Sequence, residues 1–209
     1  IANKESIVAA GRHLKALEKK YGGKIIPLDT EHSAIASCLE GENDKYIKKL
    51  ILTASGGALR DLPKSQFAKV TPEQALSHPV WKMGKKITID SATLFNKGLE
   101  IIEAMHLFEV PENKIDVVIH RESIIHSLVE FSDNSMKALL STPNITLSID
   151  RALYYPEKNT NSVSSLSLTE VGSLTFEAPD YDKFPCLSIA REMAKNISLI
   201  PENCQLPLK

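Results

Sequence analysis

The fold class of this chain is decided by the stretch Lys49-Leu50-Ile51-Leu52-Thr53-Ala54-Ser55-Gly56-Gly57. Its first five residues form a short, mostly apolar run, which is typical of a strand buried on both faces of a sheet. The run stops at Ser-Gly-Gly, where a hydroxyl and unhindered backbone N–H groups are a common way to hold a phosphate. A plain turn explains the same residues, and on their own they favour it.

Outward from this strand, the pattern alternates between strands and helices. Further strands are expected at 24–28, 86–90 and 115–120. Helices are expected at 6–21, 33–39, 92–108 and 184–195, with short ones near 66, 73–75 and 124–125. A hairpin is expected from 128–131 and 136–140. These elements predict an α/β fold with an open, largely parallel sheet, covering helices and an antiparallel hairpin at one edge.

Composition excludes several classes of function. The chain has 209 residues and a formal net charge of −1, which offers no electrostatic basis for binding nucleic acid or an anionic membrane surface. No apolar run approaches the roughly 20 residues of a membrane helix. Three scattered cysteines, Cys38, Cys186 and Cys204, are too few for a disulfide framework or a zinc site, so a reducing compartment is expected.

Two acids stand close together in Asp29-Thr30-Glu31. If the strand at 24–28 continues through Glu31, both carboxylates point to one face, about 6.5 Å apart along the chain. Hard oxygen ligands of this kind select Mg²⁺ or Mn²⁺ over zinc. The alternative is a solvated turn with Asp29 near a helix N-cap, and the motif alone favours that alternative.

The helix expected from residue 92 is apolar around most of its circumference. Its narrow polar stripe holds Asn96, Glu100 and Glu103, with Lys97 at the edge. Such a helix is largely buried, and buried charges need partners. A metal and a phosphorylated ligand would satisfy Glu100 and Lys97 together. The alternative is an internal Lys97–Glu100 pair, but the narrowness of the stripe favours a functional role.

Two further segments carry candidate site residues. Ser91 ends the strand expected at 86–90 and begins the polar-striped helix, so it is either a second phosphate-binding hydroxyl or only an N-cap. The only tryptophan, Trp81, lies in the loop His78-Pro79-Val80-Trp81-Lys82-Met83-Gly84. Large apolar residues in a loop either attach it to the core or close over a ligand.

Taken together and in order, these motifs resemble the 1-deoxy-D-xylulose 5-phosphate reductoisomerases of the non-mevalonate isoprenoid pathway. The resemblance covers nearly all of residues 1–140. The motifs are Asn3-Lys4-Glu5-Ser6, Asp29-Thr30-Glu31-His32, Ser55-Gly56-Gly57, His78-Pro79-Val80-Trp81-Lys82-Met83-Gly84, Asp90-Ser91-Ala92-Thr93, Asn96-Lys97-Gly98-Leu99-Glu100 and His120-Arg121-Glu122-Ser123-Ile124-Ile125-His126-Ser127.

The resemblance implies roles for individual residues. It implies metal ligation by Asp29, Glu31 and Glu100. It implies a phosphate pocket of Ser55, Ser91, Asn96 and Lys97 with His78 beside it, and contacts to the sugar hydroxyls from Lys4 and Thr30. It implies NADPH contacts from Asn3, Glu5 and Gly84, and a closing flap that includes Trp81 and Met83.

The resemblance also implies an activity. An enzyme that uses NADPH and Mg²⁺ or Mn²⁺ (or Co²⁺) would convert 1-deoxy-D-xylulose 5-phosphate to 2-C-methyl-D-erythritol 4-phosphate. It would be a homodimer and a fosmidomycin target, in a bacterial cytoplasm or a plastid stroma. The competing hypotheses are a non-catalytic module that binds a divalent metal and a phosphosugar, and a structural or dimerisation domain with a decayed site.

The family pattern implies a division of the chain into parts. Residues 1–27 are expected to be the end of an NADPH-binding domain, whose Rossmann-type remainder is missing, so that the chain alone would be inactive. Residues 28–156 would form the catalytic domain, 157–183 a linker arm and 184–209 the start of a C-terminal helical region. Two departures from the family pattern stand out, Thr30 in place of serine and Pro143-Asn144-Ile145-Thr146 in place of Pro-Asp-Met-Arg.

Overall fold

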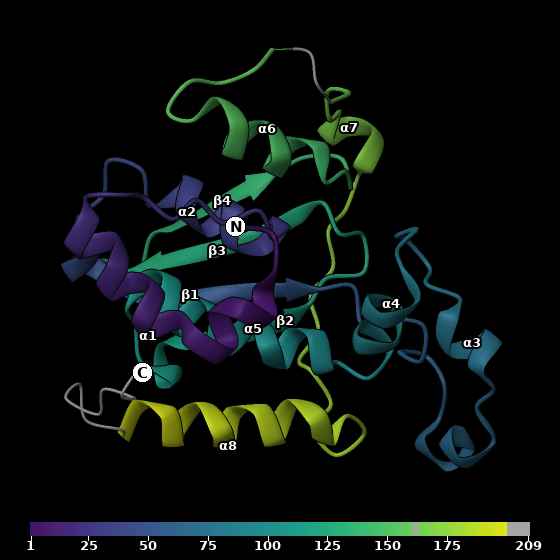
Figure 1. The fold of residues 1–209 in the computed structure, drawn as a ribbon. Helices are drawn as coiled ribbons and strands as arrows, with labels where there is room; N and C mark the ends of the chain where they lie inside the picture. The colour runs from purple at the N-terminus through teal and green to yellow at the C-terminus, as the bar shows by residue number, and fades with distance from the viewer. Residues whose placement is uncertain (161–162, 200–209) are drawn as a thin grey trace.

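The computed structural model describes residues 1–160 and 163–199 (Figure 1). The helices are α1 Lys4–Tyr21, α2 Thr30–Cys38, α3 Pro72–Leu76, α4 Lys85–Ala92, α5 Phe95–Phe108, α6 Thr146–Tyr154, α7 Leu168–Val171 and α8 Pro185–Leu199. The strands are β1 Ile47–Ala54, β2 Ile115–Ile119, β3 Ile125–Phe131 and β4 Met136–Leu140. Short 3-10 turns lie at Asp44–Tyr46, Lys64–Lys69 and Glu112–Lys114.

The four strands form one open sheet in the order β2-β1-β3-β4. The α/β class and the edge hairpin of β3 and β4 are confirmed. The sheet is mixed rather than largely parallel, because only β1 and β2 run parallel. A short turn after β2 reverses the chain, so β3 returns beside β1 in the antiparallel direction.

The central strand β1 is the core of the molecule, as its apolar run predicts. Leu50 and Leu52 are fully buried between the neighbouring strands and the covering helices. Helix α5 packs against β1 and β2, while α2 packs against β3 and β4. Helices α1 and α8 cover α5 in turn (Figure 1). The α5–α8 contact is tight, because a Cβ atom on Gly98 would lie 2.5 Å from Cβ of Ala190.

The strand predicted at 24–28 is wrong. This segment is extended, but it pairs with the first residue of the chain instead of the sheet: Leu28 N donates to Ile1 O at 3.0 Å, and the Ile1 ammonium donates to Ile26 O at 2.6 Å. Pro27 lacks the N–H that a sheet position requires. The chain then enters α2 at Thr30, three residues earlier than predicted.

The strand predicted at 86–90 is also wrong, since these residues belong to helix α4. Its alternating Ile87 and Ile89 imitate a strand, but a 2.6 Å ion pair between Lys86 and Asp90 has the i, i+4 spacing of a helix. Leu94, in the left-handed region with φ 57°, separates α4 from α5. The helix predicted from residue 92 therefore begins at Phe95.

The short helix predicted near 124–125 is replaced by the start of β3. Helix 6–21 is confirmed as α1, and the helix expected at 184–195 extends through α8. The short helices near 66 and 73–75 are present as a 3-10 turn and α3. The last part of the C-terminal region expected at 184–209 lies outside the described residues, which end at 199.

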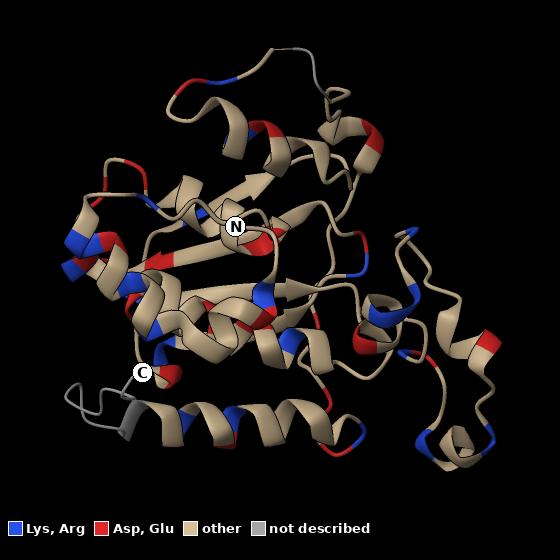
Figure 2. Ribbon diagram, in the orientation of Figure 1, with Lys and Arg blue, Asp and Glu red and all other residues tan. Residues whose placement is uncertain are grey.

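The surface mixes both signs of charge. Figure 2 shows basic and acidic residues side by side along α1 and α8. In the described part of the chain, no helix combines the length and the apolar character needed to cross a membrane.

Candidate active site

A cavity of about 440 Å³ lies where α2, α4, α5, the end of β1 and the start of β3 meet. It collects every residue that the sequence assigned to the metal, the substrate or the flap. These residues are Lys4, Asp29, Thr30, Glu31, Ser55, His78, Trp81, Met83, Ser91, Asn96, Lys97 and Glu100. Residues far apart in the sequence thus form one polar pocket.

The three predicted metal ligands converge in this cavity. Asp29, Glu31 and Glu100 each offer a carboxylate oxygen, and these oxygens lie within 4.8 Å of one another. The strand geometry predicted for the first two is wrong. Asp29 is the N-cap of α2 and accepts from Glu31 N at 3.3 Å, so the first turn of the helix brings the two acids together. Glu100, fully buried in α5, completes the group.

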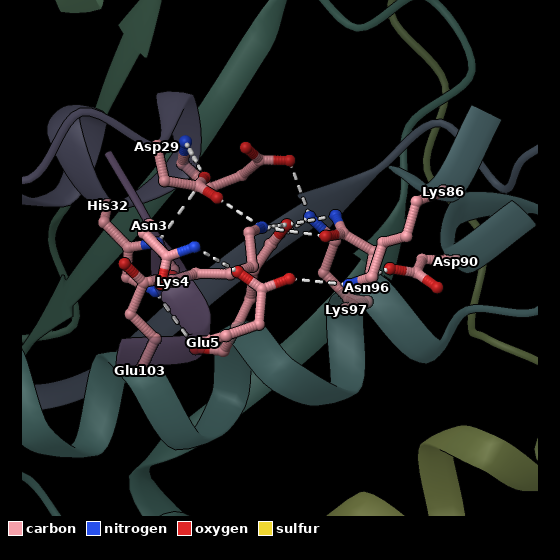
Figure 3. Close-up of polar contacts among 12 residues, drawn as sticks. Asn3, Lys4, Glu5, Asp29, His32, Lys86, Asp90, Asn96, Lys97 and Glu103 are labelled. Atoms are coloured by element: carbon pink, nitrogen blue, oxygen red, sulfur yellow. Dashed lines mark hydrogen bonds and ion pairs between the residues drawn. The ribbon is translucent and has the colours of Figure 1, made fainter. Parts of the chain in front are cut away.

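Two lysines lie among these carboxylates (Figure 3). The Lys4 ammonium pairs with Asp29 and lies 3.1 Å from Glu100. Lys97 Nζ lies 2.6 Å from Glu31 and also contacts Glu100. Each buried charge therefore has an opposite charge beside it, which is the condition for burying it at tolerable cost.

The cluster shifts the titration of its members. Burial and the neighbouring Glu100 raise the pKa of Glu31 to about 8. Burial alone would lower the pKa of Lys97, but the carboxylates of Glu100 and Glu31 raise it. Burial alone would raise the pKa of Asp29, but the Lys4 ammonium and His32 hold it well below the usual range. The lysines are thus charged at neutral pH.

This donor set fits a divalent metal. Carboxylate oxygens that converge on one point are the ligands that Mg²⁺ and Mn²⁺ prefer. The two ammonium groups supply the compensating positive charge in this structure. Asp29, Glu31 and Glu100 are therefore able to hold Mg²⁺ or Mn²⁺.

Behind the carboxylates, His32 connects α2 to α5. Its ring is fully buried, with Nε2 3.0 Å from the backbone oxygen of Glu100. Its Nδ1 lies 3.5 Å from Asp29 and 3.4 Å from Glu103, and these acids raise the pKa of His32 to about 9 although burial opposes the shift. Sequence reasoning gave His32 no role and did not say what Glu103 on the polar stripe contacts.

The other end of the cavity is built by the turn after β1. Gly56 and Gly57 have φ of 86° and 70°, conformations that favour glycine. A Cβ atom on Gly57 would lie 2.3 Å from Ser91 O, so only glycine lets this turn lie against α4. Ser91 lies near the end of α4 and is not the N-cap that the sequence suggested.

Ser55 and His78 face each other in this part of the cavity. His78 Nδ1 accepts from the backbone N–H of Trp81 at 2.9 Å, which leaves the hydrogen on Nε2, 3.0 Å from Ser55 Oγ. Burial and the nearby Arg60 lower the pKa of His78. Together with Asn96 and Lys97, these donors make a pocket suited to a phosphate group.

The predicted NADPH contacts lie outside the cavity lining. Asn3 is the N-cap of α1, and its side chain accepts from Ser6 N. Glu5 pairs with Lys86 at 2.6 Å and so links α1 to α4, and Gly84 is the N-cap of α4. All three residues are exposed.

Sequence reasoning missed several residues that line the cavity, namely Lys82, Ser123, Ile125, His126 and Ile145. The motif at 120–127 contained three of them, but the helix expected there hid their placement. Ile145 belongs to the segment that departs from the family pattern.

Comparison with known proteins agrees with this geometry. Residues 25–108 match the family model described as the 1-deoxy-D-xylulose 5-phosphate reductoisomerase C-terminal domain. Residues 140–202 match the model described as the DXP reductoisomerase C-terminal domain.

Curated relatives share about half their length with this chain. A protein from Bacillus thuringiensis named 1-deoxy-D-xylulose 5-phosphate reductoisomerase 1 is 54% identical over 195 residues, which are 93% of this chain and 51% of the relative. A reductoisomerase from Desulforamulus reducens is 52% identical, over 93% of this chain and 50% of its own.

Solved structures are similar over the same extent. A crystal structure of DOX-P reductoisomerase in complex with NADPH, fosmidomycin and magnesium has a TM-score of 0.88 and 47% identity, over 93% of this chain and 50% of that chain. The reductoisomerase from Zymomonas mobilis in complex with NADPH has a TM-score of 0.86 and 42% identity, with the same coverage. This chain therefore belongs to the 1-deoxy-D-xylulose 5-phosphate reductoisomerase family and carries its C-terminal domains.

Proposed function

We propose that the protein to which this chain belongs converts 1-deoxy-D-xylulose 5-phosphate to 2-C-methyl-D-erythritol 4-phosphate with NADPH. The observation that carries the proposal is one cavity lined both by a carboxylate triad and by the hydroxyl, amide and ammonium donors that a phosphate needs. A ketose phosphate needs both, a cation at its carbonyl and an anion site at its phosphate.

Asp29, Glu31 and Glu100 would hold Mg²⁺ or Mn²⁺. The bound metal would supply Lewis-acid stabilisation of the oxygen at which negative charge develops. His32 keeps α2 and α5 in register by its contacts to Asp29 and to the Glu100 carbonyl. The carboxylates are thus held in place before any ligand binds, which reduces the reorganisation that binding requires.

The phosphate would bind to the Ser55 and Ser91 hydroxyls, Asn96 and Lys97, with His78 donating through Nε2 to Ser55. Binding energy at this remote group fixes the reacting carbons relative to the metal end. Lys4 and Thr30 also line the cavity, where they would contact the sugar hydroxyls.

The loop that carries Trp81 and Met83 would act as a flap. Trp81 is half-buried and Met83 is 37% exposed at the cavity wall, so both have an apolar surface for a ligand to cover. Closure would exclude water from a reactive intermediate.

NADPH would lie beside this flap, with Asn3, Glu5 and Gly84 as its contacts from this chain. We assign residues 1–27 to the end of the NADPH-binding domain, 28–156 to the catalytic domain, 157–183 to a linker arm and 184–209 to a C-terminal helical region. Since the chain spans about half the length of its relatives, it would need the rest of a cofactor domain for the hydride step.

We further propose a homodimer in a bacterial cytoplasm. Strand β4 is the edge of the described sheet, and the apolar Met136 on it is 55% exposed, so this edge offers a surface for a second copy. Light scattering at micromolar concentration tests this assignment. A monomer would argue against it.

A second candidate is a module that binds a divalent metal and a phosphosugar without catalysis. The observation behind it is the cavity itself, whose carboxylate triad and phosphate donors would bind a metal and a phosphosugar whether or not turnover follows. Turnover separates the two candidates. NADPH oxidation that depends on 1-deoxy-D-xylulose 5-phosphate, in the protein as the cell makes it, supports the enzyme, and metal-dependent ligand binding without turnover supports the module.

The site itself is tested by calorimetry of Mn²⁺ with and without fosmidomycin. We expect inhibitor binding that depends on Mn²⁺ and disappears in Glu100→Gln. The matched control is Glu109→Gln, since Glu109 follows the same helix but is exposed. Equal binding by wild type and Glu100→Gln would contradict the proposal.

A further inference from the structure

His120, at the end of β2, uses both ring nitrogens although it has no place in the proposed chemistry. Its Nε2 lies 3.1 Å from the backbone N of Ile124 and 3.1 Å from that of Ile125. An amide can only donate, so Nε2 accepts. Its Nδ1 lies 2.9 Å from the carbonyl oxygen of Thr175 and 3.0 Å from Glu122 Oε2, and both oxygens accept the hydrogen that Nδ1 carries. The ring is therefore neutral, with its hydrogen on Nδ1.

The same histidine holds the segment at 175–177 against the sheet. Its ring stacks on Phe176 with 4.9 Å between centroids, and it is fully buried. The Glu122 carboxylate accepts from the Thr175 hydroxyl at 2.7 Å, and Glu177 exchanges backbone hydrogen bonds with Ile119 at 2.8 and 2.9 Å. A stretch of the linker arm thus lies on His120 from the outside.

On the inside, the two amides bonded to His120 lie in the segment 123–126, which forms part of the cavity wall. Ser123, just before them, has φ 53°, a left-handed conformation that is uncommon outside glycine and persists only where the surroundings impose it. Ser123, Ile125 and His126 all line the cavity. Beyond His120, Thr53 Oγ1 donates to the Ile125 carbonyl at 2.8 Å.

We propose that His120 is a positioning residue that holds the 123–126 wall of the cavity in its binding conformation and couples that wall to the 175–177 segment. It touches no ligand. Its Nε2 accepts hydrogen bonds from two successive backbone amides, and its Nδ1 donates to the 175–177 segment. Only the neutral tautomer with its hydrogen on Nδ1 is able to do both. The expected effect on ligand affinity rests on the proposed function, whereas the expected effect on the conformation of residues 123–126 does not.

Two substitutions separate the two halves of this role. In His120→Gln, the side-chain carbonyl reaches the position of Nε2 and is able to accept from the wall. In His120→Asn, the side-chain amide reaches only the position of Nδ1 and is able to donate to Thr175. His106→Gln is the control, because His106 is a half-buried histidine of α5 that does not line the cavity.

The first measurement is amide hydrogen exchange in the protein without ligand. Losing one hydrogen bond should speed exchange of the Ile124 and Ile125 amides by about tenfold in His120→Asn, and much less in His120→Gln. Exchange at these amides that is unchanged in His120→Asn, or equally fast in both variants, would overturn the proposal.

The second measurement is the affinity for fosmidomycin in the presence of Mn²⁺. We expect His120→Asn to bind about tenfold more weakly than His120→Gln, because both hydrogen bonds from the wall amides to His120 are lost. His106→Gln should change the melting temperature without changing affinity. A loss of thermal stability in His120→Asn with unchanged affinity would reduce His120 to a structural residue. If wild type itself fails to bind, the proposed function fails, and the exchange result alone decides the role of His120.

Discussion

Lys97 Nζ lies 2.6 Å from Glu31 Oε1, although the two residues are 66 positions apart in the chain. The contact ties the first turn of α2 to the first turn of α5, and the same ammonium also contacts Glu100. Without ligand, Glu31 and Glu100 are thus paired with Lys97, the lysine that would bind the phosphate in the proposed function. If metal and phosphate bound together, the carboxylates would pair with the metal and the Lys97 ammonium would pair with the phosphate.

Replacing Lys97 with methionine should destabilise the metal-free protein by about 3 kcal/mol, because it leaves Glu31 without an opposite charge and the buried Glu100 with Lys4 alone. Mn²⁺ should restore much of the loss, since a divalent cation supplies the missing positive charge. Urea denaturation with and without Mn²⁺ measures both effects. Lys85→Met, on an exposed residue at the start of α4, is the control. A Lys97→Met protein as stable as wild type would contradict this account.

Removing the Ser55 hydroxyl should weaken the binding of inorganic phosphate by about tenfold, the usual effect of losing one hydrogen bond to a charged group. Calorimetric titration of phosphate into Ser55→Ala and wild type tests this. Ser135→Ala, in the exposed β3–β4 turn, should bind like wild type. Unchanged affinity in Ser55→Ala would place the anion elsewhere in the cavity.

Gly57→Ala should destabilise the fold by about 1–3 kcal/mol, since it puts a side chain at positive φ and against the Ser91 carbonyl. The matched substitution is Gly23→Ala, where no atom lies within 4 Å of the added Cβ. Thermal unfolding of the two variants should therefore differ clearly. Equal melting temperatures would show that the turn after β1 is able to shift.

His126 should make stability fall in acid. Burial lowers its pKa from 6.5 to about 4, while Nε2 lies 2.7 Å from Ser141 Oγ. The unfolded chain binds this proton first, so the full stability is present above pH 6.5 and is lost as pH falls towards 4. The loss amounts to about 3 kcal/mol.

The measurement is the difference in unfolding free energy between wild type and His126→Asn from pH 4 to pH 8. It should shrink as pH falls, because the variant lacks the group whose protonation costs stability. The pKa of His32 is raised to about 9, so its contribution to the unfolding free energy changes only above pH 6.5 and does not produce this signal. A difference that is constant with pH would mean that folding leaves the pKa of His126 unchanged and would contradict this prediction.

The sequence predicted the members of the site better than their geometry. Asp29 and Glu31 were expected on one strand, but a helix brings them together. The Asp29 side chain caps α2 by accepting a hydrogen bond from the backbone N–H of Glu31. The apolar run of β1 was predictable because a buried central strand tolerates only such residues.

Errors arose where local pattern and tertiary context disagree. Ile87 and Ile89 alternate like a strand, yet no neighbouring strand is available to them in the described sheet and they belong to α4. Ser123 and His126 were missed because their place in the cavity depends on a reversal at a left-handed residue, which no side-chain period reveals.

The close contact between Gly98 and Ala190 has a consequence for drug resistance. Gly98 lies between Lys97 and Glu100 on α5, but it points to α8, where there is no room for a larger side chain. A bulkier residue on either side of this contact would push α5 and move both charged groups, without altering any residue that a fosmidomycin-like molecule would touch. Selection for growth under such a compound should therefore return substitutions at the α5–α8 contact, outside the pocket itself.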